Sequence, residues 1–172
     1  MAEAVAGRGW PKFALITVPL IVIAGSASGW LSNSGFGNGW FNSLLKPPFM
    51  PPGWAFPVAW TTLYILMGVA LAMVLAAPAT PTRRMALALF FVQLALNFAW
   101  SPVFFGAHDI KLGKILILAM LVIALAAAAQ FRRIRPAAGW LMLPYLLWLC
   151  FAWALNSSID QLNPGAGTSL LG

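Results

Sequence analysis

The sequence predicts an all-α integral membrane protein, a single domain over residues 1–172 in which five transmembrane helices form a bundle. The chain is 62% hydrophobic and only 8% charged, with a mean hydropathy of +0.87, so it cannot cover itself with a water-soluble surface. Its charged residues also leave five charge-free intervals, at 13–45, 47–82, 85–108, 115–131 and 136–159. Each is close to or longer than the ~20 residues that cross a bilayer as a helix.

The five helices are expected at about 13–32, 54–77, 84–104, 112–132 and 137–158. The first follows Arg8 and Lys12 and accommodates Pro19 as a kink. A basic start, a short apolar run and small residues also fit a signal peptide, so this alternative stays open.

The second helix is preceded by a long segment, 32–53, that is rich in Gly and Asn and is expected to fold over one end of the bundle. Its four prolines, in KPPFMPP, prevent a helix before about Gly53. Beyond them, one helical face carries Trp54, Pro57, Thr61, Tyr64 and Gly68. This face is either an interfacial aromatic belt with a packing seam or the wall of a binding site.

The third helix carries two patterned faces. Gln93, Asn97 and Ser101 recur every four residues, so they share one face of the helix. They are expected either to form hydrogen bonds between helices or to contact a ligand. Ala95 and Ala99, extended by Ala88, permit close approach of a second helix. We therefore expect a homodimer through this seam, with packing inside one bundle as the alternative.

Metal chemistry is not expected, because the chain has one histidine, His108, and one cysteine, Cys150. His108 is expected to be a solvated loop residue, with haem ligation as the alternative. Cys150 lies in an apolar run and is expected to be a buried, inert thiol. The alanine-rich fourth span carries no evident chemistry.

The fifth helix repeats the aromatic theme of the second, since Tyr145, Trp148, Ala152 and Asn156 fall on one face. Two aromatic faces and the amide face of the third helix can enclose a flat, mostly apolar cavity.

Basic residues predict the orientation in the lipid bilayer rather than a nucleic-acid surface. Seven lie in the segments of one side, against Lys46, Lys111 and Lys114 on the other; the seven are Arg8, Lys12, Arg83, Arg84, Arg132, Arg133 and Arg135. The N-terminus is therefore expected in the cytoplasm and the C-terminus outside.

Three motifs, KPPFMPPGWAFPVAWTTLYILMG, NFAWSPVFFG and PYLLWLCFAWALN, occur in that order. Together they resemble the tryptophan-rich sensory protein and translocator protein family, also called peripheral-type benzodiazepine receptors. The resemblance implies a five-helix bundle, commonly dimeric, that binds porphyrins, haem and benzodiazepine-type ligands, with no cofactor required. The ligand-binding positions that it implies are Trp54, Tyr64, Asn97, Trp100, Tyr145, Trp148 and Ala152, with Phe49 where the family commonly has tryptophan.

Three functions stay open on this basis. The first is binding or sensing of a porphyrin, haem or similar flat apolar ligand, favoured because the spans lack the charged residues of ion and proton translocators. The second is light- and oxygen-dependent porphyrin degradation, in which Trp54 and Trp148 would be the redox partners. The third is a scaffold without a small ligand. A sterol ligand is not expected, since NSSIDQLNP lacks the tyrosine and base of the sterol pattern.

Overall fold

The computed structural model describes residues 9–167, so Arg8 lies outside the described part. Five helical segments there are long and apolar enough to cross a membrane, which confirms the predicted all-α membrane bundle. Each occupies the interval expected for it, with ends moved by about one turn at most. The segments are α2 (Trp10–Leu31), α4 (Ala55–Leu75), α5 (Pro81–Ser101) extended by η1 (Pro102–Gly106), α6 (Ile110–Ile134), and α7 (Pro136–Leu141) followed by α8 (Leu143–Leu162).

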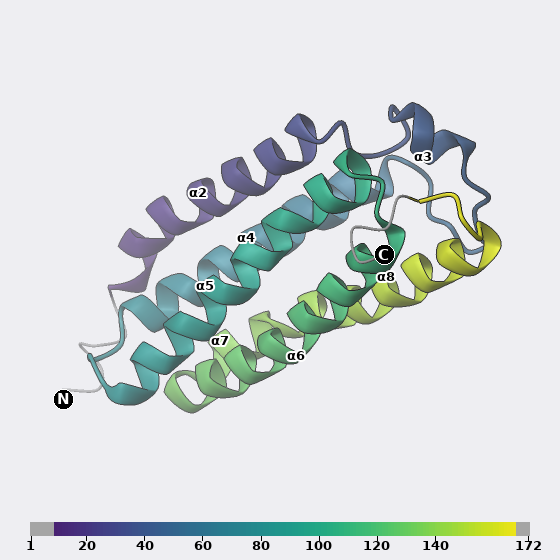
Figure 1. Cartoon of the computed structure of the whole chain (residues 1–172). Coiled ribbons are helices and arrows are strands. Elements are labelled where there is room, and N and C mark those ends of the chain that lie inside the picture. The colour runs from purple at the N-terminus through teal and green to yellow at the C-terminus, as the bar shows by residue number, and fades with distance from the viewer. Residues whose placement is uncertain (1–8, 168–172) are drawn as a thin grey trace.

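Helix α2 is an outer helix whose main partner is α4, whereas α6 packs against both α5 and α8 (Figure 1). The contact between α2 and α4 is close because Gly68 has no side chain: a Cβ there would lie 2.7 Å from Val18 Cα. The Thr17 hydroxyl donates a hydrogen bond to the Gly68 carbonyl oxygen across this contact, at 2.8 Å. Close approach and a hydrogen bond together hold two helices in lipid, where the hydrophobic effect does not.

The half of the bundle near α7 is filled with side chains. Phe90 of α5 stacks on Phe131 of α6 with ring centroids 5.4 Å apart. Met67, Val74 and Met142 fill the space around them, and all five side chains are completely buried. This end of the bundle is therefore a packed core.

The opposite end is covered by the segment between α2 and α4, as expected from the sequence. It contains a short helix, α3 (Gly39–Ser43), where the Asn38 side chain accepts a hydrogen bond from the Phe41 amide. The Asn163 side chain, just after α8, accepts from the Leu45 amide at 2.7 Å and donates to the Leu45 carbonyl at 2.8 Å. Two hydrogen bonds thus fasten the covering segment to the end of α8.

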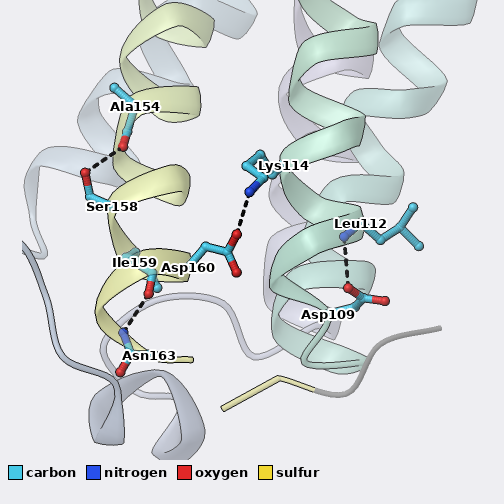
Figure 2. A network of polar contacts seen from close by, with 8 residues as sticks. All are labelled: Asp109, Leu112, Lys114, Ala154, Ser158, Ile159, Asp160 and Asn163. Carbon is cyan, nitrogen blue, oxygen red and sulfur yellow. Dashed lines mark hydrogen bonds and ion pairs between the residues drawn. The ribbon is translucent and has the colours of Figure 1, made fainter. Parts of the chain in front are cut away.

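Polar contacts also join α6 to α8 near this end (Figure 2). The Lys114 ammonium lies 2.5 Å from an Asp160 carboxylate oxygen, and both side chains are only partly exposed. The Asp109 carboxylate caps α6 by accepting a hydrogen bond from the Leu112 amide, at 2.9 Å. The ion pair therefore joins α6 to α8, while the cap satisfies a backbone amide at the start of α6.

The structure corrects two local predictions. Cys150 is exposed on the outer side of α8, because Leu149 and Leu146 occupy the inward face and Cys150 lies one step round the helix. His108 is half-buried rather than solvated, since its ring stacks on Trp40 with centroids 4.4 Å apart.

Candidate ligand-binding cavity

A cavity of about 560 Å³ lies in the half of the bundle covered by the segment between α2 and α4. Its walls come from α2, α4, α5 with η1, α6 and α8, and the covering segment contributes Asn33, Ser34, Gly35, Phe36, Phe41, Met50 and Gly53. The packed core around Phe90 and Met67 fills the bundle beyond it. The arrangement is that of a pocket between helices, with a size typical of small-molecule sites.

Aromatic rings of α4 and α8 form one wall of this cavity. Trp60 and Trp148 meet edge to face with centroids 6.1 Å apart, and Phe56 meets Trp148 at the same distance. Trp60 also lies against Tyr64 at 5.3 Å. Ala152 lines the cavity one turn beyond Trp148. Large rings beside a small side chain leave room for a flat ligand to stack.

A chain of hydrogen bonds lies behind this wall. The Tyr64 hydroxyl donates to Asn97 Oδ1 at 3.0 Å, and Asn97 Nδ2 donates to the Tyr145 oxygen at 3.2 Å. The Tyr145 hydroxyl in turn donates to Gln93 Oε1 at 2.8 Å. Gln93 therefore joins helices, as one sequence interpretation proposed, while Asn97 both joins helices and lines the cavity. Because its members are buried and paired, the chain fixes the orientation of Tyr64.

The sequence-predicted positions fall into two groups. Tyr64, Asn97, Trp100, Trp148 and Ala152 line the cavity together.

The other three lie elsewhere. Tyr145 is completely buried behind the cavity, within the hydrogen-bond chain. Trp54 precedes α4 and is 69% exposed, and Phe49 is 48% exposed, with its ring 6.4 Å from Phe151. Trp54 and Phe49 do not belong to the lining of the cavity, although the Phe151 side chain beside Phe49 does.

Residues that the sequence interpretation did not single out complete the lining. Trp60 takes the place expected of Trp54, and its spacing of four from Tyr64 was an available signal. Ile117 and Met120 of α6 also line the cavity. No pattern in the alanine-rich fourth span marks them, because apolar residues there face core, cavity and lipid alike.

The chemistry of the lining is apolar with scattered uncharged polar groups. No Lys, Arg, Asp, Glu or His lies among the lining residues of the described part. Residues 9–167 also contain no group of three His, Cys, Asp or Glu side chains that could hold a metal ion. His108 is stacked on Trp40 outside the lining. The cavity is therefore suited to binding by stacking and hydrogen bonds.

A five-helix membrane bundle with an uncharged aromatic cavity defines a class: multi-pass membrane proteins that can hold a small apolar molecule between their helices. Residues 16–162 match the model of the TspO/MBR family, and the chain belongs to this family. It is 39% identical to Protein CrtK of Rhodobacter capsulatus over 127 residues, covering 73% of this chain and 79% of that protein. It is similar, at 38% identity over 133 residues, to the Translocator protein of Ovis aries, covering 76% and 79% of the two chains.

Proposed function

We propose that this protein is a membrane receptor that holds a flat, largely apolar ligand of the tetrapyrrole class, a porphyrin or haem, in the cavity. The observation that supports the proposal is the wall made by Trp60 and Trp148, whose rings line an uncharged space of about 560 Å³. A tetrapyrrole is a large planar aromatic ring system, so binding against such a wall buries apolar surface and allows stacking on the tryptophan rings.

The experiment compares two tryptophans of the same helix. Trp148 lines the cavity, whereas Trp153 lies outside the lining and is exposed on α8. Trp148→Ala should weaken protoporphyrin binding about tenfold or more, because it removes a stacking partner worth roughly 1 kcal/mol beyond the buried area. Trp153→Ala should bind protoporphyrin like the wild type. Equal protoporphyrin affinities in the two variants would contradict the proposal.

A second candidate is light- and oxygen-dependent degradation of the bound porphyrin. The observation that favours it is the continuous contact of Trp148, Trp60 and Tyr64, which places oxidisable rings against the ligand space. The complex should then bleach under illumination in air faster than free protoporphyrin, and Trp148→Phe should slow the reaction. Bleaching at the rate of free porphyrin would exclude the degradation activity and leave only the receptor function.

We also propose that the end of the bundle near α7 faces the cytoplasm. Arg83, Arg84, Arg132, Arg133 and Arg135 all lie at the helix ends there, and basic residues are retained on the cytoplasmic side. A cysteine introduced at Arg84 should react with a membrane-impermeant maleimide only after the cells are opened. Labelling of intact cells would contradict this orientation.

A homodimer through α5 is the corresponding proposal for assembly. Ala88, Ala95 and Ala99 are exposed on the outside of the bundle, so they do not pack within it. In lipid, such small side chains allow close helix contact. Ala95→Leu should give monomers by mass measurement in detergent, and unchanged dimers would place the interface elsewhere.

A further inference from the structure

Three of the five buried side-chain polar atoms that lack a hydrogen-bond partner in the described residues belong to two residues of the cavity wall. Among the described residues, both Asn156 Nδ2 and Asn156 Oδ1 are unpaired, as is Trp100 Nε1. Asn156 is only 2% exposed, and both residues belong to the lining. The buried amides of Asn97, Gln93 and Asn38, by contrast, have partners. An unpaired buried amide is costly, so this site calls for a partner that the chain itself does not provide.

Gly113 of α6 brings these atoms together. A Cβ built at Gly113 would lie 3.3 Å from Asn156 Nδ2, 3.4 Å from Trp100 Nε1 and 3.1 Å from a ring carbon of Phe104. The amide of α8 and the indole of α5 thus converge on the one place where α6 has no side chain. The ring of Phe104 stacks on that of Trp100, with centroids 4.9 Å apart, and holds the indole in this orientation.

We propose that Asn156 and Trp100, converging above Gly113, form a polar subsite of the cavity that accepts an uncharged carbonyl oxygen of the ligand, as in an ester or amide. This inference rests on the proposed function and, within the tetrapyrrole class, favours esters and amides; the ionised propionates of a free porphyrin or haem would remain outside this subsite. Two N–H donors, one from Asn156 and one from Trp100, suit the two lone pairs of a carbonyl oxygen. The Asn156 oxygen then accepts from an N–H where the ligand carries an amide.

The absence of charge in the lining determines the class of ligand group. An ionised carboxylate placed here would be buried with no Lys, Arg or His among the described lining residues to neutralise it. A carbonyl oxygen carries no such penalty. Asn156 Nδ2, Asn156 Oδ1 and Trp100 Nε1 are all closed off by neighbouring side chains, so a ligand carbonyl reaches them only when the cavity wall opens at this point. Turning the Asn156 amide during this opening breaks no hydrogen bond within the described residues.

The test uses two porphyrins that differ only in ester groups: etioporphyrin, with alkyl substituents, and mesoporphyrin dimethyl ester. Asn156→Leu keeps the approximate volume of the side chain but removes its donors. It should weaken binding of the ester about tenfold while leaving etioporphyrin affinity within about twofold. Trp100→Phe should show the same selectivity with a smaller loss. Ser158→Ala is the control, since within residues 9–167 the Ser158 hydroxyl bonds only to the Ala154 carbonyl of its own helix (Figure 2).

The outcomes separate this subsite from the function on which it rests. If wild type and Asn156→Leu bind the ester equally, the subsite is wrong and the receptor function stands. Equal losses for the ester and etioporphyrin would show a change in cavity shape and would also overturn the subsite. If neither porphyrin binds the wild-type protein, the receptor function fails together with the subsite. A larger Asn156-dependent gain for the free diacid than for its ester would contradict the uncharged class.

Discussion

Replacing Gly68 by alanine should force α2 away from α4 and open the cavity wall that α2 contributes. The new Cβ would lie 2.7 Å from Val18 Cα and 3.1 Å from Val18 N. Both are backbone atoms, so no side-chain rotation relieves the clash and the helices must separate. Separation also lengthens the hydrogen bond from Thr17 to the Gly68 carbonyl, now 2.8 Å.

The magnitude follows from these two losses. Overpacking costs about 1–3 kcal/mol, and a hydrogen bond between helices in a membrane contributes roughly 0.6 kcal/mol, so the free energy of unfolding should fall by about 2–4 kcal/mol. Helix α2 supplies Gly25, Ser26, Gly29 and Trp30 to the cavity lining. Ligand affinity should therefore fall together with stability.

Thermal unfolding in detergent, with and without protoporphyrin, measures both effects. In a chain of this size ~1 kcal/mol corresponds to roughly 2–4 °C, so Gly68→Ala should lower the midpoint by several degrees. Gly106→Ala is the matched control, because nothing lies within 4 Å of a Cβ there. A Gly68→Ala protein as stable as the Gly106→Ala protein, with unchanged affinity, would refute this account of how α2 and α4 pack.

Three further variants test the cavity and its surroundings. Ala152→Leu adds bulk to the wall and should weaken rigid ligands more than flexible ones, by about 1–3 kcal/mol in competition assays; equal effects would place Ala152 outside the site. Tyr145→Phe leaves two buried amides short of a partner and should lower the unfolding free energy by about 1–3 kcal/mol, and an unchanged melting curve would contradict the hydrogen-bond chain. Asn163→Ala removes both hydrogen bonds to Leu45 and should speed ligand release several-fold in stopped-flow measurements; unchanged rates would show that the covering segment does not control access.

Hydropathy and proline placement were sufficient to predict the spans, because a bilayer demands apolar helices of a set length and prolines stop a helix before Trp54. The inward face of a helix was harder to predict. Trp54 shares a spacing pattern with Tyr64, yet it lies ten residues away and about 80° round the helix, whereas Trp60 lies about 40° away. Trp54 also precedes the first residue of α4 and is 69% exposed, so its place at the exposed start of the helix, and not its angle alone, separates it from the lining.

Burial relative to the cavity was beyond sequence reasoning for a different reason. Tyr145 and Trp148 belong to the same face of α8, but only the packing of α5 decides that Tyr145 bonds to Gln93 behind the wall while Trp148 lines the space. The importance of Gly113 likewise depends on Asn156 and Trp100, which approach it from other helices. Such convergence depends on tertiary contacts that no local spacing encodes.

The most direct test of the receptor function is an equilibrium titration of the purified protein with protoporphyrin, followed by tryptophan fluorescence and the porphyrin absorption band. The cavity predicts saturable binding of one porphyrin per chain, with a shifted absorption band and strong quenching of Trp60 and Trp148, which line the space. Trp148→Ala should lose both affinity and part of the quenching. Unsaturable quenching that is equal in the wild-type and Trp148→Ala proteins would show partitioning into detergent and would contradict the proposed function.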